Sequence, residues 1–270
     1  MQDTRIAAQG IVLLGCGKMG SAMLAGWLSR GLPTDKVWVL DPAPSEWVRG
    51  TGVQVNTNLP AAPAIVLIAV KPQMMGDALP AITALAGGDT VFVSVAAGTS
   101  IAAFETAFGA QTPIVRAMPN TPAAVGQGIT ALCANAAGLS ALDEAALLMS
   151  AVGDVVLLDG EGQMDAVTGV SGSGPAYVFH LIETLAAGGE AQGLPADLAL
   201  QLAKATVAGA GALAMQATED PGQLRVNVTS PNGTTQAALE VLMDAENGFP
   251  ALLPRAVAAA TNRSKELANG

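Results

Sequence analysis

The chain has 270 residues, of which 51% are hydrophobic and only 13% are charged, and its formal net charge is −10. This length allows one large core or two domains. The acidic balance argues against nucleic acid as a partner, because nucleic-acid-binding proteins need basic patches. So little charge covers the surface poorly, which predicts that apolar surface is buried against another subunit.

The sequence argues against membrane, export and metal-binding segments. It has no run of about 18 unbroken apolar residues, the length that spans a membrane. Its start, Met1–Arg5, lacks a basic region followed by an apolar one, so we expect no signal peptide. Cys16 and Cys133 are the only cysteines, and His180 is the only histidine. We therefore expect a soluble cytoplasmic protein with reduced thiols and no metal site.

Strand and helix signals alternate through the first 160 residues. Strands are expected at 11–14, 37–41, 53–55, 65–70, 90–95, 113–117, 129–134 and 154–159. Helices are expected from Met19 to near Gly31, from about 73 to 85, from Ser100 to near Gly109, and over 140–151 with Ser140 as N-cap. Such repeated βα units with short connections predict a doubly wound, mostly parallel α/β sheet of the Rossmann type over 1–160.

No convincing strand signal follows Gly160. From Met164 to the end, alanine-rich helical stretches are interrupted by Gly-Pro, Asp-Pro-Gly and Ser-Pro-Asn-Gly turns. This pattern predicts an all-helical domain over 161–270. Small residues on several helix faces, as in 209–212, suit close packing of helices within and between subunits.

A glycine-rich turn joins the first strand to the first long helix. Gly15, Gly17 and Gly20 form a G-x-G-x-x-G fingerprint between an apolar run and a helical pattern. The first glycine allows a tight turn, the second lets the backbone approach a pyrophosphate, and the third lets the helix pack close to the strand. The helix N-terminus then offers N–H groups to the phosphates. The fingerprint predicts dinucleotide binding, and the alternative is a glycine-rich turn that binds nothing.

The second strand ends in an acid. Asp41 lies 21 residues after Gly20, where a group that contacts the adenosine ribose belongs. A carboxylate there would repel a 2′-phosphate and so favours NADH. The alternative is an aspartate that only shapes a turn with Pro42.

Other strand ends supply further candidates. Residues 69–73 (Ala-Val-Lys-Pro-Gln) and 95–98 (Val-Ala-Ala-Gly) would lie along the cofactor side of the sheet, and Lys71 would reach a phosphate or a ribose unless it is merely solvated. The turn-rich stretch 116–122 (Arg-Ala-Met-Pro-Asn-Thr-Pro) is expected to line the substrate cleft.

The helical half contributes two short motifs and one titratable side chain. The stretch 171–177 opens a long helix, in which His180 reads more readily as a packed core histidine than as a proton donor. The turn 228–235 is rich in hydroxyl groups and leads into a helix, an arrangement that suits a carboxylate. Ordinary N-capping is the alternative for this turn.

The titratable inventory narrows the chemistry. The sequence offers no His–carboxylate pairing, metal cluster or nucleophile elbow, so a bound cofactor would perform the difficult step. Reduction of a C=N bond fits, because an imine nitrogen is basic and arrives protonated. We therefore expect an NADPH- or NADH-dependent reductase.

Five stretches resemble pyrroline-5-carboxylate reductase, the last enzyme of proline biosynthesis, and the match spans nearly the whole chain. They are the fingerprint with Lys18-Met19, then 70–73, 116–122, 169–177 and 224–235, of which the last is the most specific. The resemblance implies reduction of 1-pyrroline-5-carboxylate to L-proline by hydride transfer from NADPH or NADH. It also implies homodimers built through intertwined C-terminal helices, which some members assemble further into decamers.

The resemblance also implies roles for single residues. The turn would hold the substrate carboxylate, with Thr235 as the catalytic residue whose hydroxyl bonds the ring nitrogen. The expected substrate contacts are Ser230, Asn232, Gly233, Thr234 and Thr235. The expected cofactor contacts are Gly15, Gly17, Lys18, Met19, Gly20, Asp41, Asn56, Ala69, Val70, Lys71, Pro72, Ala96, Ala97, Met118, Asn120 and Asn227.

Two positions depart from the family pattern. Asn232 replaces a glycine of the usual Ser-Pro-Gly-Gly-Thr, although asparagine tolerates a left-handed conformation better than most residues. Asp41 stands where NADPH-using relatives often have Ser or Thr, which again favours NADH.

Two other functions are compatible with parts of the pattern. A β-hydroxyacid dehydrogenase would need a lysine where this chain has Val178, and a non-catalytic dinucleotide-binding regulator would not need the Ser230–Thr235 turn.

Overall fold

The computed structural model describes residues 4–269, which form two compact units. The first contains the chain up to Gly172 together with its end from Ala260 onward, and the second is Ser173–Ala259. Residues 1–3, on which part of the signal-peptide expectation rests, lie outside the described residues.

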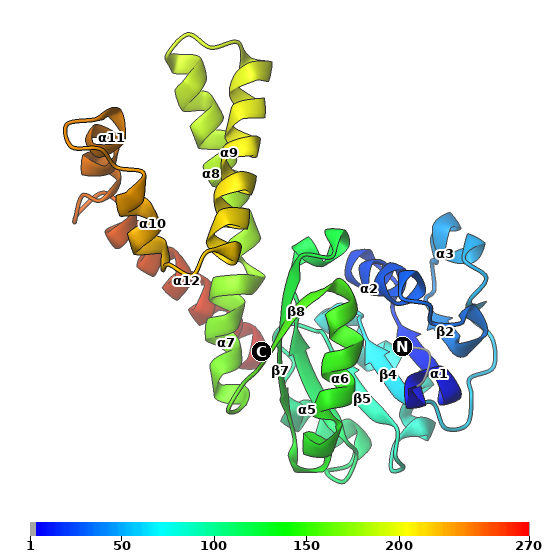
Figure 1. Cartoon of the computed structure of the whole chain (residues 1–270). Helices are drawn as coiled ribbons and strands as arrows, with labels where there is room; N and C mark the ends of the chain where they lie inside the picture. The colour runs from blue at the N-terminus through cyan, green and yellow to red at the C-terminus, as the bar shows by residue number, and fades with distance from the viewer. Residues whose placement is uncertain (1–3, 270) are drawn as a thin grey trace. The chain divides into compact units, whose positions relative to one another are not determined.

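The first unit is built on one sheet, which has eight strands within the described residues, in the order β3-β2-β1-β4-β5-β6-β7-β8 (Figure 1). Neighbouring strands are parallel except β6 and β7. The doubly wound, mostly parallel sheet is therefore confirmed. The strands are β1 (Ile11–Leu14), β2 (Val37–Leu40), β3 (Gln54–Val55), β4 (Ile65–Ile68), β5 (Val91–Ser94), β6 (Ile114–Met118), β7 (Gly128–Ala134) and β8 (Gly153–Leu157).

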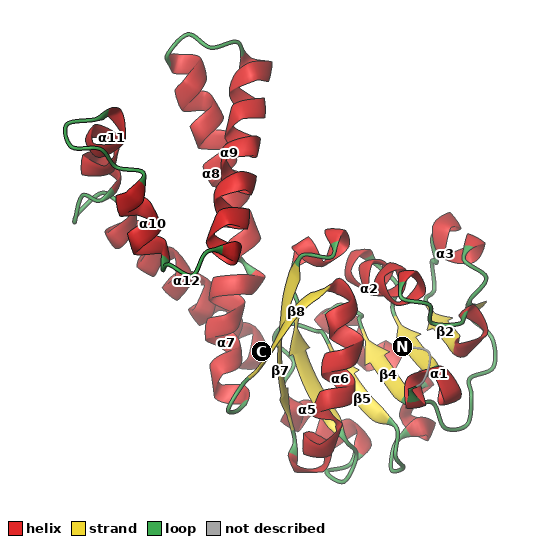
Figure 2. Ribbon diagram, viewed as in Figure 1, coloured by secondary structure: helices red, strands yellow, loops and turns green. Residues whose placement is uncertain are grey.

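Helices cover both faces of this sheet (Figure 2). Because successive strand residues point to opposite faces, Ile11 and Leu13 of β1 pack with α2 and α6, whereas Val12 and Leu14 pack with α5. The indole of Trp27 in α2 is fully buried and donates to the carbonyl of Leu148 at 3.1 Å. The helices are α1 (Arg5–Gln9), α2 (Lys18–Ser29), α3 (Glu46–Gly50), α4 (Met75–Ala78), α5 (Ile101–Phe108), α6 (Leu142–Met149) and α7 (Met164–Val167).

Two expected helices are shorter than the sequence predicts. The stretch 73–85 is not one helix, since only α4 is α-helical and 3₁₀ turns flank it. Pro80 has no N–H to donate, which breaks the helical ladder. Ser140 is not an N-cap either: it lies inside a 3₁₀ segment, Ala136–Ala141, whose start is capped instead by the Asn135 side chain, and α6 begins only at Leu142.

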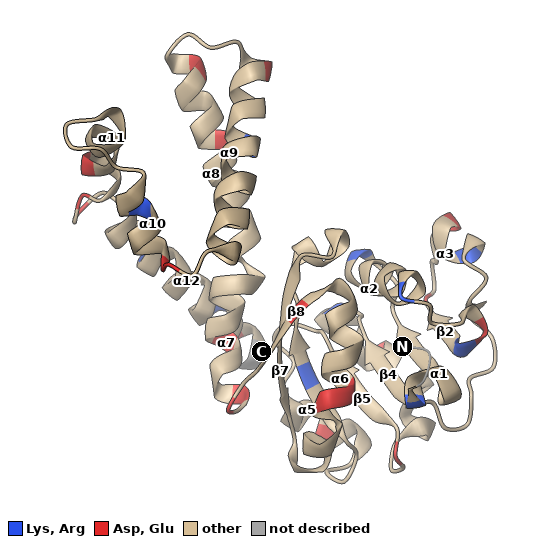
Figure 3. Cartoon of the chain, viewed as in Figure 1, with Lys and Arg blue, Asp and Glu red and all other residues tan. Residues whose placement is uncertain are grey.

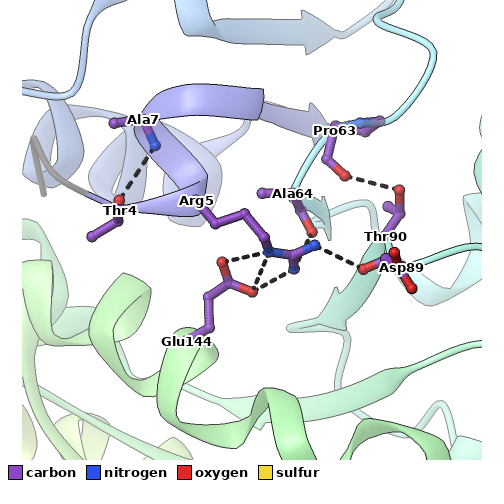
Figure 4. A network of polar contacts seen from close by, with 8 residues as sticks. All are labelled: Thr4, Arg5, Ala7, Pro63, Ala64, Asp89, Thr90 and Glu144. Carbon is purple, nitrogen blue, oxygen red and sulfur yellow. Dashed lines mark hydrogen bonds and ion pairs between the residues drawn. The ribbon is translucent and has the colours of Figure 1, made fainter.

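An arginine joins the first helix to the rest of the unit (Figure 4). Arg5 donates through Nε and Nη2 to the Glu144 carboxylate on α6, with a shortest distance of 2.5 Å. The same guanidinium reaches the carbonyl oxygens of Asp89 at 2.9 Å and Ala64 at 3.1 Å. The pKa of Arg5 is raised mainly by its hydrogen bond to Glu144. These bonds anchor α1 to the loops before β4 and β5 and to α6.

The second unit is helical. Its helices are α8 (Gly174–Ala191), α9 (Ala196–Gln216), α10 (Pro221–Asn227), α11 (Thr234–Leu242) and the first part of α12 (Phe249–Asn269). The prediction that no strand follows Gly160 is confirmed for the described residues. Helices α8 and α9 lie side by side as a hairpin, and Figure 3 shows that they carry few charged residues.

This helical unit buries little of its own apolar surface. The buried cluster between α8 and α9 consists of Ala186, Ala199 and Ala203. Larger apolar side chains, among them Phe179 and Leu202, are exposed in the single chain. By length and composition alone α9 is apolar enough to cross a membrane, and only 11% of its apolar stretch is buried within the single chain. The small buried cluster indicates that the unit is completed by something outside one chain.

Candidate active site

The cofactor segments predicted from the sequence come together at one edge of the sheet. The paired residues Leu14–Leu40, Leu14–Ile68 and Ile68–Ser94 show that β1, β2, β4 and β5 end level with one another. Strand β6 continues past Arg116, the partner of Ser94, to Met118. Strand order reverses between β1 and β4, with β2 and β3 on one side and β5 and β6 on the other. Dinucleotides bind in the crevice outside such a switch point.

The three glycines of the loop have different reasons to be glycine. Gly15 has φ 87°, and a Cβ there would lie 2.8 Å from a Val70 methyl group. A Cβ on Gly20 would lie 2.5 Å from the Gly15 oxygen, so this glycine lets α2 close onto the loop. A Cβ on Gly17 would meet nothing within 4 Å. Packing does not demand Gly17, whereas the approach of a pyrophosphate does, so the loop fits a dinucleotide.

The helix after this loop begins without a side-chain cap. The first helical residue of α2 is Lys18, and Gly17 at the N-cap has no side chain to accept its free N–H groups. These groups carry the positive end of the helix dipole and suit a phosphate. Lys18 is exposed beside them.

Asp41 faces the glycine loop. Its Oδ2 accepts the N–H of Cys16 at 2.6 Å, and its Oδ1 accepts the N–H of Ala43 at 2.8 Å. The second bond closes a turn around Pro42, which is the alternative role that the sequence suggests for Asp41. The first bond adds that the carboxylate is held against the phosphate loop, which is the position of a ribose-binding acid.

The side chain of Asn56 hydrogen-bonds the backbone of Asp41. Its side-chain oxygen accepts the Asp41 N–H at 3.0 Å, and its side-chain nitrogen donates to the Asp41 carbonyl at 2.8 Å. Asn56 has φ 51°, a left-handed conformation that asparagine tolerates. The sequence alone gave no sign of this pairing.

The later strand ends contribute a mixture of exposed and buried groups. Lys71 and Pro72 are exposed after β4, Ala69 and Val70 are half-buried, and Ala96 and Ala97 follow β5 with little exposure. Asn120 accepts the N–H of Ile129 at 3.0 Å, which ties the loop after β6 to β7. Met118 is half-buried and lies against Gly172.

Arg116 does not line a cleft as the sequence predicts. Its side chain is only 6% exposed, and its Nη1 lies 2.6 Å from Glu161. The same Glu161 oxygen accepts the N–H of Ile101 at the start of α5. Arg116 therefore ties β6 to the segment before α7, because a buried guanidinium needs a carboxylate partner.

The expected substrate turn lies in the second unit. The N–H of Gly233 donates to the Ser230 carbonyl at 3.0 Å, and Asn232 has φ 58°, so asparagine does adopt the left-handed conformation here. Gln236 accepts the Asn232 N–H at 2.7 Å, a contact that sequence reasoning missed. No side chain caps α11, whose first two residues are Thr234 and Thr235. Free N–H groups and hydroxyls at a helix start suit a carboxylate.

Two other residues of the second unit are exposed. The histidine expected in the core is not there: His180 is 75% exposed and lies 3.2 Å from Glu183. The apolar neighbours that suggested burial, Phe179 and Leu181, are exposed in the single chain as well. Asn227 ends α10 and accepts a hydrogen bond from Gln223 at 2.8 Å.

The thiols and acidic groups offer no further chemistry in this site. Cys16 and Cys133 are free and buried, as expected for reduced thiols. Burial raises the pKa of Cys16 and raises that of Cys133 to about 11. Across residues 4–269, no group of three His, Cys, Asp or Glu side chains is placed to hold a metal ion.

Two family models match different parts of the chain. The model described as NADP oxidoreductase coenzyme F420-dependent matches residues 10–98. The model described as pyrroline-5-carboxylate reductase dimerisation matches residues 161–267. The first match holds the glycine loop and Asp41, and the second holds the Ser230–Thr235 turn.

Known proteins match over nearly the full length. The pyrroline-5-carboxylate reductase of Pseudomonas aeruginosa is 39% identical over 265 residues, 96% of each chain. That of Synechocystis is 41% identical over 94% of this chain and 97% of the relative. The chain belongs to the pyrroline-5-carboxylate reductase family. The family resemblance predicted from the sequence is confirmed, and with it an NAD(P)H-dependent oxidoreductase.

Solved structures of this reductase family agree. The enzyme from Coxiella burnetii superposes with a TM-score of 0.89 at 32% identity, covering 96% of this chain and 98% of the other. The Plasmodium falciparum pyrroline carboxylate reductase with NADP bound has a TM-score of 0.83 at 28% identity, with the same coverage. The match of the reductase dimerisation model to 161–267, which contains α8 and α9, supports the expected homodimer.

Proposed function

We propose that the protein reduces the C=N bond of 1-pyrroline-5-carboxylate to give L-proline, the last step of proline biosynthesis, with hydride from NADH or NADPH. Full-length membership of the reductase family supports this activity. The observation that carries the substrate assignment is the uncapped start of α11. Its first two residues are Thr234 and Thr235, and the left-handed Asn232 precedes it.

The substrate carboxylate is bound by this turn. Its two oxygens accept the N–H groups of Thr234 and Thr235, and the positive end of the helix dipole stabilises the charge. Ser230, Asn232 and Gly233 shape the turn that presents these groups. The Thr235 hydroxyl bonds the ring nitrogen and so orients the C=N bond.

The cofactor is bound at the sheet edge. The N–H groups at the start of α2 bind the pyrophosphate, with Lys18 and Met19 beside it, and Gly17 leaves room for the approach. The stretches 69–72 and 96–97, together with Met118, Asn120 and Asn227, complete the cofactor contacts. The bound nicotinamide supplies hydride to the imine carbon, and the imine nitrogen, which arrives protonated, becomes the amine of proline.

Asp41 makes NADH the preferred cofactor. Its carboxylate, which accepts the Cys16 N–H, also accepts hydrogen bonds from the adenosine ribose hydroxyl groups of NADH. A 2′-phosphate would bring up to two negative charges close to this carboxylate, which repels them. The Asp41→Ser variant should therefore lower the ratio of kcat/KM with NADH to kcat/KM with NADPH by about tenfold, about 1.4 kcal/mol.

The quaternary and cellular setting follows the family. The homodimer assembles further into a decamer made of such dimers. The protein acts in the cytoplasm and has neither nucleic acid nor membrane as a partner. The low charge of the helical unit supports assembly, because its exposed apolar side chains need a cover.

The direct test of the function is a cofactor-oxidation assay. Purified protein given 1-pyrroline-5-carboxylate should oxidise NADH faster than NADPH, with proline as the product by chromatography. No proline with either cofactor would refute the proposed activity. Proline formed with NADPH in preference would retain the activity and refute the role of Asp41.

A further inference from the structure

Within residues 4–269, Asn56 is the only side chain that hydrogen-bonds both backbone polar groups of Asp41. Its amide oxygen takes the Asp41 N–H at 3.0 Å and its amide nitrogen gives a hydrogen bond to the Asp41 carbonyl at 2.8 Å. The backbone N–H of Asn56 donates in turn to the Val39 carbonyl at 2.9 Å. The Asn56 side chain thus extends the β2–β3 pairing by one residue beyond the end of β3.

The hydrogen bonds to Asp41 occupy both the carbonyl and the nitrogen of the Asn56 side-chain amide. A side-chain amide offers one carbonyl and two N–H groups, and Asn56 places the carbonyl and one N–H on the Asp41 backbone. Its left-handed backbone, with φ 51°, turns the side chain back toward β2. Asn56 therefore acts first on Asp41 rather than on a ligand.

The Asp41 carboxylate depends on this backbone. Its two oxygens are fixed by the N–H groups of Cys16 and Ala43, which lie on opposite sides of it along the chain. Those bonds keep the carboxylate at the phosphate loop only while the Asp41 backbone stays in place. The side chain of Asn56 provides that constraint at the end of β2.

We propose that Asn56 is a positioning residue that sets the choice between NADH and NADPH by holding the Asp41 carboxylate at the glycine loop. The proposal rests on the cofactor role of Asp41 given under the proposed function. The positioning role and a direct contact between Asn56 and the cofactor predict opposite changes in NADPH use when the Asn56 amide is lost. A direct contact with a 2′-phosphate would make loss of the Asn56 amide weaken NADPH use, whereas the positioning role makes the same loss relieve NADPH use.

The experiment measures kcat/KM for NADH and for NADPH at saturating 1-pyrroline-5-carboxylate. The variant is Asn56→Gly, because glycine keeps the positive φ without strain and removes only the amide. The ratio of NADH to NADPH efficiency should fall roughly fivefold, as expected for one lost hydrogen-bonding group. The control is Asn58→Ala, an exposed asparagine two residues along the same loop, which should leave the ratio unchanged.

A double variant tests whether Asn56 acts through Asp41. In the Asp41→Ser background, Asn56→Gly should change the ratio by less than about twofold, because the carboxylate that it positions is gone. The KM for 1-pyrroline-5-carboxylate should stay the same in all of these variants.

The outcomes separate this inference from the proposal beneath it. If Asp41→Ser lowers the ratio and Asn56→Gly does not, Asp41 keeps its role and the positioning role is overturned. A higher ratio in Asn56→Gly, from a selective loss of NADPH use, would instead indicate direct contact with the 2′-phosphate. If Asp41→Ser itself leaves the ratio unchanged, the role of Asp41 fails, and the inference with it.

Discussion

The sheet unit and the helical unit bury their apolar residues in opposite ways. The sheet unit encloses large side chains such as Trp27, Phe92 and Phe104 between its strands and helices. The helical unit encloses three alanines and leaves residues such as Phe179 and Leu202 exposed. A unit with so small a core gains little from folding alone. The sheet unit therefore has a core large enough to be stable within one chain, whereas the helical unit, which matches the reductase dimerisation model, needs a cover from outside the chain.

The largest expected effect comes from charging the exposed apolar surface of the helical unit. Leu202→Glu on α9 would bury a carboxylate in the dimer, so we expect the dimer dissociation constant to rise at least about a hundredfold. Light scattering coupled to size exclusion measures this change.

The matched control for the dimer is Leu147→Glu on α6, a leucine of similar exposure in the sheet unit. It should leave the dimer intact. Equal dissociation in both variants would contradict the distinction between the two units, and an unchanged dimer in Leu202→Glu would place α9 outside the interface.

The second effect concerns Thr235, which we propose contacts the substrate and not the cofactor. Thr235→Ala should raise the KM for 1-pyrroline-5-carboxylate by about tenfold, because one hydrogen bond to a charged or polar substrate group is lost. The KM for NADH should change by less than about twofold. The control is Thr218→Ala, an exposed threonine before α10. Equal losses for substrate and cofactor would rule out the assignment of Thr235.

The third effect concerns the anchor within the sheet unit. Arg5→Ala removes bonds to Glu144 and to two carbonyl oxygens, and should lower the free energy of unfolding by about 1–2 kcal/mol. Urea denaturation measures it. Arg263→Ala breaks a mostly exposed pair with Glu266 on α12 and should cost less than about 0.5 kcal/mol. A larger cost for Arg263→Ala would reverse the expected order.

The effect expected to be smallest at neutral pH is a pH dependence of the sheet unit, which appears only above about pH 9. The pKa of Cys133 is raised by burial to about 11 from 9.0, so its native thiol stays protonated where the unfolded thiol ionises. Its contribution to stability is present below pH 9 and is lost as the pH rises through about 11. Subtracting the profile of Cys133→Ala from that of the wild type should leave a slope of at most about 1.4 kcal/mol per pH unit. A flat difference would mean that the thiol is accessible to water.

The sequence predicted most of what depends on local pattern. The apolar runs, the three glycines and Asp41 each have a spacing that a parallel sheet explains, and the structure brings them to one edge. The run of helices after Gly160 was predicted equally well. The pattern was ambiguous at 73–85, where Pro80 interrupts the helical signal, and this stretch forms 3₁₀ turns in place of one helix.

Contacts between distant residues were not predictable from pattern. Arg116 meets Glu161 across 45 positions, and Asn56 meets Asp41 across 15, so neither pairing follows from any helical or strand period. The prediction that His180 is buried was wrong for another reason. Its apolar neighbours suggested a core, but the helical unit has almost no core in one chain. Burial that depends on a second copy leaves the same sequence pattern as burial within the chain.

The measurement that tests the central claim most directly follows the hydride itself. The protein is supplied with 1-pyrroline-5-carboxylate and NADH that carries deuterium at both C4 positions, and the proline is examined by mass spectrometry. The proline should carry one deuterium, bonded to the former imine carbon. Proline without deuterium, or no proline at all, would contradict hydride transfer from the nucleotide held by the glycine loop.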